Sequence, residues 1–152
     1  MNQTAATFGI LDNRFLSRSI GLLDPPEPVI IGKDASVAEA VALLKEDKVG
    51  AVVIVDETGA VAGIFTERDV VLKLDVCEAN LDQVPIAERM TVDPHCQMLT
   101  HSMAYALNMM STGGYRHIPL VDENHHPVGV LSVKNIVDYI VQELLRDLET
   151  FA

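Results

Sequence analysis

The sequence predicts an α/β protein (α+β in its arrangement) made of two strand-helix-strand-strand-helix units that pack with pseudo-two-fold symmetry. The first observation is a duplication: residues 36–73 align without a gap on residues 102–139, at a constant offset of 66 residues. The second is that each copy repeats one order of hydrophobic patterns. The third is a length of 152 residues with 49% apolar residues, which suits one folded domain. Because each copy has an apolar face that it cannot bury alone, we expect the copies to pack together and to leave a ligand cleft between them.

Residues 1–24 precede the aligned range, and we expect them to form an N-terminal extension that is partly helical and docks on the rest of the chain. We then expect the first unit over residues 25–80 and the second over residues 81–152, with no flexible linker between them. The apolar residues that give the extension its helical spacing are Ile10, Leu11, Phe15, Leu16, Ile20 and Leu23.

The first copy begins after a proline-rich stretch at residues 25–28, which ends any helix and favours extended backbone at residues 29–31. Ser36 followed by Glu39 is a capping-box pattern and predicts the start of a helix. The valine-rich run at residues 50–55 predicts a buried strand. We expect a turn at 56–59, a strand at 60–65 and a helix at about 67–74, and then a connector over 75–90 with a short helix at 86–89.

The second copy repeats this order and ends in a longer helix. That last helix carries a continuous apolar stripe, which needs another element or another chain to cover it, so we expect a homodimer. The elements expected are a weak strand at 95–99, a helix at 102–111 stopped by Gly113 and Gly114, a strand at 116–121, a turn at 122–126, a strand at 127–131 and the helix from 133 toward 149.

Composition excludes several classes of partner. With 11 basic and 22 acidic residues the net charge is −11, which repels nucleic-acid polymers and offers no attraction to anionic membranes. No apolar run approaches the roughly 18 residues of a membrane span, and the start of the chain does not resemble a signal peptide, so we expect a cytoplasmic protein. Cys77 and Cys96 lack C-x-x-C spacing, and we expect two buried or half-buried thiols and no disulfide.

The strongest local signal occurs once in each copy, at residues 63–69 and 129–135. Each segment has a glycine in a buried strand, a hydroxyl residue at the strand's end, and a short polar residue three positions later. Thr66 as a helix N-cap with Asp69 in the first turn explains one copy structurally. The recurrence in both copies favours a ligand site as well, since a carboxylate at a helix start can accept hydrogen bonds from both hydroxyls of a ribose.

These two segments, together with the run at residues 116–122, make the chain resemble the cystathionine β-synthase (CBS) domain family in its form of two tandem motifs. The resemblance covers about residues 26–142. It implies a non-catalytic sensor, called a Bateman module, that binds AMP, ADP, ATP or S-adenosylmethionine in clefts between the motifs. In such pairs the aspartate holds the ribose, the first strand flanks the adenine, and cations from the opposite motif reach the phosphates.

The resemblance places the main site at Thr66 and Asp69. For the second copy it implies a weaker or empty site at Ser132 and Asn135, with Arg68 as its cation, because an amide cannot offer a diol two charge-assisted acceptors. The further residues that it assigns to the main site are Ile30 and Ile31 beside the base and Arg116, His117 and Lys134 beside the phosphates.

We expect no catalytic residues and no metal site, because the histidines and cysteines lack zinc-site spacing and no nucleophile motif is present. A Mg²⁺ ion that arrives with a nucleotide needs no dedicated ligands. Two alternatives stay open: a structural interaction module without a ligand, and a small hydrolase or transferase that uses His117 as a base. The sequence does not identify the adenosyl ligand or the effector protein that such a module regulates.

Overall fold

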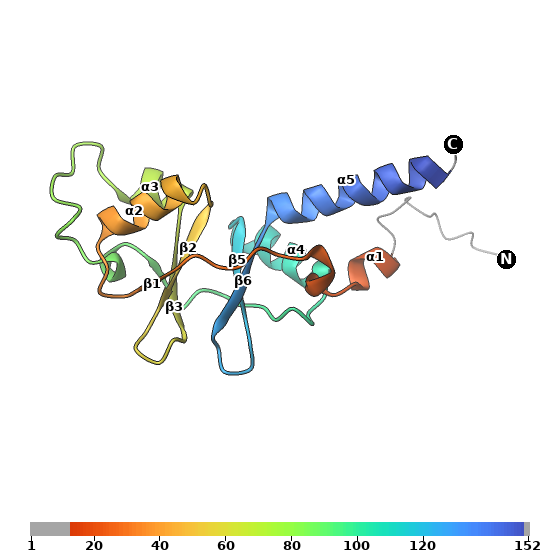
Figure 1. Ribbon diagram of the computed structural model, residues 1–152, viewed down its shortest axis with the longest axis horizontal. Helices are drawn as coiled ribbons and strands as arrows, with labels where there is room; N and C mark the ends of the chain where they lie inside the picture. Colours follow the sequence, from red (N-terminus) through yellow and green to blue (C-terminus); the bar gives the residue numbers. More distant parts are fainter. Residues whose placement is uncertain (1–12, 151–152) are drawn as a thin grey trace.

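The computed structural model describes residues 13–150, and these form two units side by side with their strands at the centre and helices on the outer sides (Figure 1). One sheet has four strands in the order β1-β2-β3-β4, in which β1 runs parallel to β2 and the other pairs are antiparallel. The second sheet is the antiparallel pair β5-β6. The α+β class and the paired units predicted from the sequence are therefore confirmed.

The first unit follows the predicted order. Its capping box is present: the Ser36 N–H donates to Glu39 Oε2 at 2.7 Å and the Glu39 N–H donates to Ser36 Oγ at 3.1 Å. The elements are β1 (Ile30–Gly32), α2 (Val37–Glu46), β2 (Ala51–Val55), β3 (Val61–Thr66) and α3 (Glu67–Lys73).

The second unit differs from the prediction at its start. The strand expected at 95–99 is wrong: only Gln97 pairs, in an isolated parallel bridge to Leu120, because the Met98 carbonyl turns back at once to accept from the His101 N–H at 3.0 Å. A two-residue strand forms earlier and pairs with β3 of the first unit. The elements are η2 (Ile86–Glu88), β4 (Thr91–Val92), α4 (Met103–Gly113), β5 (His117–Val121), β6 (Pro127–Ser132) and α5 (Val133–Thr150).

The two sheets meet at an apolar seam. Along β2, Val52 and Ile54 face the helices of their own unit, whereas Ala51 and Val53 face the other sheet. The strand is apolar without alternation because both of its faces are buried. The residues that form the seam are Ala51, Val53, Val61, Ile64, Val121 and Val130.

The N-terminal segment is built into the second unit. It contains α1 (Asn13–Ser17) and η1 (Ile20–Leu23), and Ile20 is fully buried in the core of that unit. Its backbone contacts repeat, at the 66-residue offset, those that the connector makes with the first unit. The matching hydrogen bonds are Ile20 N to His101 O (2.8 Å) with Ile86 N to Ala35 O (2.7 Å), and Met103 N to Arg18 O (2.9 Å) with Val37 N to Val84 O (2.8 Å).

This correspondence extends the duplication back to residues 18–22, which the sequence alignment placed outside it. We call the stretch that precedes each unit its lead segment. Each lead segment crosses to the opposite unit: residues 18–21 lie against the second unit and residues 84–86 against the first. The remaining part of the predicted extension, residues 1–12, lies outside the described residues.

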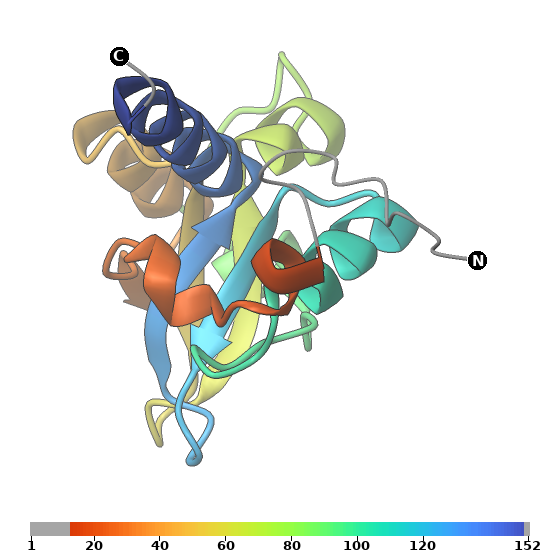
Figure 2. The ribbon, with the colours of Figure 1, turned by 90° about the vertical axis from the view of Figure 1, so that its right-hand side faces the viewer.

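Helix α5 extends past the body of its unit, and α1 lies beside its middle turns (Figures 1 and 2). The Arg18 guanidinium, just after α1, donates to the Tyr139 hydroxyl of α5 at 2.8 Å and to Glu143 at 3.0 Å. The centroids of the Phe15 and Tyr139 rings lie 5.8 Å apart. Within residues 13–150, no helix combines the length and the apolar character needed to cross a membrane.

We expect Ile20→Ala and Ile86→Ala to destabilise the protein by similar amounts, about 2–4 kcal/mol each, because both side chains are fully buried at equivalent places in the two units. Urea unfolding of each variant measures this. Leu22→Ala is the control, since Leu22 is 58% exposed and its truncation should cost little. An Ile20→Ala variant as stable as the parent would show that the N-terminal segment is only an appendage.

Candidate functional site

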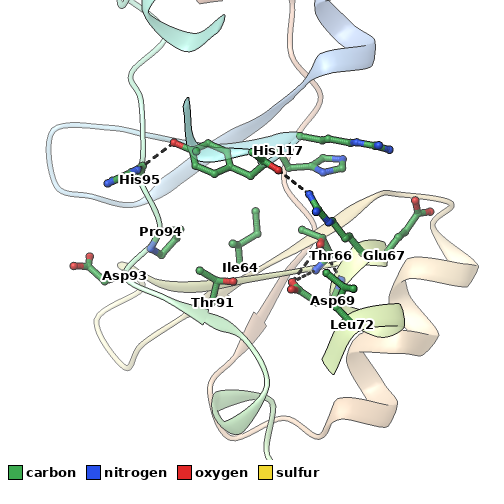
Figure 3. A pocket seen from close by; sticks show the side chains of 15 residues that line it. Ile64, Thr66, Glu67, Asp69, Leu72, Thr91, Asp93, Pro94, His95 and His117 are labelled. Carbon is green, nitrogen blue, oxygen red and sulfur yellow. Dashed lines mark hydrogen bonds between the residues drawn. The ribbon is translucent and has the colours of Figure 1, made fainter. Parts of the chain in front are cut away.

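A cavity of about 500 Å³ lies between the two units at the end of β3 (Figure 3). Three segments enclose it: the β3–α3 junction, the chain from β4 toward the second unit, and the loop between α4 and β5. The residues that line it are Ile64, Thr66, Glu67, Arg68, Asp69, Leu72, Thr91, Asp93, Pro94, His95, Gly113, Gly114, Tyr115, Arg116 and His117.

Asp69 is held in place by its own helix start. The Thr66 N–H donates to Asp69 Oδ2 at 2.9 Å and the Thr66 hydroxyl donates to the same oxygen at 3.2 Å, while the Asp69 N–H donates to Thr66 Oγ1 at 3.3 Å. The second carboxylate oxygen, Oδ1, pairs with the Lys73 ammonium at 3.0 Å. Asp69 is thus a buried, ordered carboxylate at the wall of the cavity.

Two hydrogen bonds lie beside the cavity, and the first of them joins the two units (Figure 3). Arg68 of the first unit donates from Nη1 to the Gly114 carbonyl of the second at 2.7 Å. The His95 ring nitrogen Nδ1 lies 3.1 Å from the Tyr115 hydroxyl. Gly114 sits at φ 69°, a left-handed conformation that suits glycine and lets α4 end with its carbonyl turned toward Arg68. Neither His95 nor Tyr115 was predicted as a site residue.

His117 stands at the boundary between the units. Its ring occupies the space beside Gly50, where an added Cβ would lie 2.5 Å from Nε2 of the ring. Burial lowers the pKa of His117 below its usual 6.5; nearby Glu67 opposes this shift and Arg116 adds to it. The ring is therefore neutral at pH 7, and the charge that sequence reasoning assigned to it is absent before a ligand arrives.

The structure brings together some of the predicted residues and separates others. Thr66, Asp69, Arg116 and His117 all line the cavity, as does Arg68, which had been assigned to the second site. Arg116 is exposed and makes no ion pair or side-chain hydrogen bond within the described residues. Lys134 is not in the lining, and its ammonium pairs with Asp138 on the next turn of α5.

Ile30 and Ile31 also lie outside the lining. They are on β1, which β2 separates from β3. The reason is the crossing of the lead segments: β4, which precedes the second unit, pairs with β3 of the first unit and brings residues 91–95 beside Asp69. The residue 66 positions before Thr91 is Pro25. The carbonyl of the neighbouring Pro26 accepts from the Val130 N–H, so this stretch lies beside β6 as β4 lies beside β3. A base bound near Asp69 thus has Thr91 to His95 as neighbours.

The equivalent position in the second unit has the same backbone and a different side chain. The Ser132 N–H and hydroxyl donate to Asn135 Oδ1 at 2.9 and 2.7 Å, and the Asn135 N–H donates to Ser132 Oγ at 3.1 Å. The helix cap is therefore conserved between the copies. Because Oδ1 is used by the cap, the remaining group of Asn135 is an amide NH₂, which donates where Asp69 accepts.

Cysteine and metal chemistry are not prominent in the described residues. No group of three or more His, Cys, Asp or Glu side chains is placed to hold a metal ion within residues 13–150. Both cysteines are free; burial raises the pKa of the Cys96 thiol to about 11, so this thiol is unreactive. Cys77 is exposed, so the expectation that it is buried or half-buried is wrong.

Comparison with known proteins agrees with this architecture. The family model described as "CBS domain" matches twice, at residues 23–75 and 83–142. The chain belongs to the CBS domain family. Its structure superposes on a CBS-domain protein from Agrobacterium tumefaciens with a TM-score of 0.71 at 30% identity, covering 80% of this chain and 98% of that one.

Two further relatives bear on function. A CBS domain protein from Pyrobaculum aerophilum, solved as a complex with AMP, superposes with a TM-score of 0.67 at 25% identity, covering 78% of this CBS chain and 89% of the other. The meiotically up-regulated gene 70 protein of Schizosaccharomyces pombe is 35% identical over 127 residues, which are 82% of this chain. The match spans only 17% of the fission-yeast protein.

We expect His117 to make the stability of the protein fall as the pH falls. Because burial lowers the pKa of His117 in the folded protein, the unfolded chain binds the proton more tightly. The contribution of the neutral ring to the free energy of unfolding is therefore complete above about pH 6.5 and is lost as the pH drops through the folded pKa. Thermal unfolding of the parent and of His117→Ala between pH 5 and 8 measures this. The difference between the two melting temperatures should shrink toward low pH, and a constant difference would contradict the burial of a neutral ring.

Proposed function

We propose that the chain is a non-catalytic sensor module that binds an adenosine-containing ligand in the cavity beside Asp69 and transmits its occupancy to an effector protein or to its own oligomer in the cytoplasm. The single observation that carries the proposal is the ordered carboxylate of Asp69 in the wall of a cavity between the units. The cavity volume of about 500 Å³ lies within the usual range of roughly 300–1,000 Å³ for small-molecule sites.

The chemistry of the lining supports such a ligand. Asp69 Oδ1 can accept from a ribose hydroxyl, and Ile64, Leu72 and Pro94 give apolar surface for a base. Arg116, which has no ion pair within residues 13–150, is a cation for a phosphate. The AMP complex of the Pyrobaculum protein supports an adenine nucleotide as a member of the ligand class. Phosphates of ADP or ATP would bring Mg²⁺ with them, and S-adenosylmethionine shares the adenosine moiety.

A second candidate function is a ligand-free structural module. It is favoured by one observation: Asp69 serves as the helix cap and is ion-paired with Lys73. A thermal-shift panel of AMP, ADP, ATP and S-adenosylmethionine on the purified protein separates the two, because a micromolar binder at millimolar concentration stabilises by several kcal/mol through mass action. A folded protein that none of the four compounds stabilises would favour the structural module.

We expect titration calorimetry to give one strong site per chain, and Asp69→Asn to weaken that site roughly 10- to 100-fold through loss of a charge-assisted hydrogen bond worth about 1.5–3 kcal/mol. The Asn substitution is chosen because Asn135 shows that an amide preserves this cap. Asn135→Ala is the matched control and should leave the strong site unchanged. Two equal sites, or binding that Asp69→Asn does not affect, would contradict the proposal.

A second copy of the chain is the proposed partner for the exposed face of α5. Val137, Val141, Leu144 and Leu148 are 46–65% exposed and follow one side of this helix, and Val71 on α3 occupies the position equivalent to Val137. Burying such a stripe against its own copy would close a two-fold interface.

We expect the parent to elute as a dimer in size-exclusion chromatography with light scattering, and Leu144→Glu to elute as a monomer, because a carboxylate at the centre of the stripe opposes burial. Gln142→Glu adds the same charge to α5 outside this stripe and should remain dimeric. A monomeric parent would remove the oligomer as a route for the signal and leave the effector protein.

A further inference from the structure

We infer that Lys73, a residue outside the cavity lining, sets the charge preference of the Asp69 cavity in favour of anionic adenosyl ligands over cationic ones. The inference rests on the proposed function and narrows its ligand class. It also names a positioning residue, since Lys73 acts through Asp69 and not by forming the wall of the cavity.

Lys73 joins the two halves of the cavity wall. Its ammonium lies 3.0 Å from Asp69 Oδ1 and donates to Thr91 Oγ1 at 3.1 Å, so one cation connects α3 of the first unit with β4 of the crossing segment. Asp69 and Thr91 both line the cavity. A lysine four residues after an aspartate on a helix is placed for such a pair.

The charge of the Asp69 carboxylate is balanced by groups of the protein itself. Its oxygen Oδ2 is used by the two donors of Thr66, and Oδ1 by Lys73, with only 12% of the Asp69 side chain exposed. A buried carboxylate requires a partner of this kind, because leaving it unpaired is costly. The pair leaves one lone pair of Oδ1 for a ribose hydroxyl while contributing no net charge to the site.

The second unit provides an internal comparison. At the position equivalent to Asp69 stands Asn135, and at the position equivalent to Lys73 stands Tyr139, whose hydroxyl accepts from Arg18 at 2.8 Å. The acid and the ammonium are thus both present in one copy and both replaced by neutral groups in the other. The ion pair behaves as one unit of the site, and not as two independent surface charges.

The charges around the cavity show what the Asp69–Lys73 ion pair does. The lining holds three carboxylates (Glu67, Asp69 and Asp93) and two arginines (Arg68 and Arg116), and His117 is neutral. Figure 3 places Glu67 and Asp93 at opposite ends of the cavity, with Asp69 between them. Lys73 cancels the central carboxylate, so the negative excess of the lining disappears. Without Lys73 that excess would repel a phosphate and attract a sulfonium group.

The test compares ligands of three charges on Lys73→Met by titration calorimetry: AMP (anionic), adenosine (neutral) and S-adenosylmethionine (cationic sulfonium). We expect AMP to weaken roughly 10-fold, adenosine by less than about 3-fold, and S-adenosylmethionine not at all or to tighten. Lys73→Arg should keep the parent's order of affinities. The ratio of AMP to adenosine affinity is the decisive quantity, because a merely structural loss would weaken both equally.

Lys33→Met is the matched control, since Lys33 pairs with Glu57 outside the cavity lining and its removal changes the net charge by the same amount. This variant should leave the ratio unchanged, and raising the salt concentration should reduce the ratio in the parent. An unchanged ratio in Lys73→Met, with the parent still binding AMP, overturns the inference and leaves the proposed function standing. A parent that binds none of the three compounds overturns the proposed function itself.

Discussion

Burial of both faces of the central strands is the constraint on which the structure depends. In β2 the side chains of Val52 and Ile54 are covered by the helices of their own unit, and those of Ala51 and Val53 by the opposite sheet. A unit with both sheet faces apolar cannot be stable in water alone, so the copies must pair. The pairing then places the end of β3 beside the start of β5, and the cavity lies at that junction.

The duplicated backbone gives two equivalent frames, and a few side chains make them different. The hydrogen bonds of the cap are the same in both copies, with Thr66 and Ser132 as equivalent donors. The charge, however, lies in one copy only, because Asp69 corresponds to Asn135 and Lys73 to Tyr139. Arg68 reaches across to the other unit, whereas its counterpart Lys134 pairs within its own helix. At the cap, the two copies therefore differ in charge and not in hydrogen bonding.

Much of this could be predicted from local pattern. The capping box at Ser36, the cap at Thr66 and the unalternating valines of β2 each have a local physical cause that a sequence displays. The interpretation of Ile30 and Ile31 as neighbours of the base came from the resemblance to the CBS family, which assigns the first strand to the adenine. The structure separates them from Asp69 because the lead segments cross, and that crossing depends on tertiary pairing of residues 18–21 and 91–92, which has no local signature.

Charge states were equally hard to predict. The resemblance made His117 a contact for the phosphates, and its neutrality follows from burial beside Gly50, which only the packed structure reveals. The ion pair of Lys73, in contrast, could be predicted from the sequence: Lys73 stands four residues after Asp69, the spacing of a helical ion pair. The second copy lacks this pair, because Asn135 and Tyr139 stand at the two equivalent positions, so the repeat itself does not point to it.

The exchange of lead segments bears on how the chain is made. As synthesis proceeds from the N-terminus, residues 18–21 emerge long before residues 99–103, the partners with which they hydrogen-bond. The first unit likewise waits for residues 84–86 to complete its core, and its seam face stays in contact with water until β5 and β6 leave the ribosome. Contacts between residues so far apart in the sequence slow folding and prolong the exposure of apolar surface that can aggregate. These two units thus reach their native state late, after β5 and β6 have been translated.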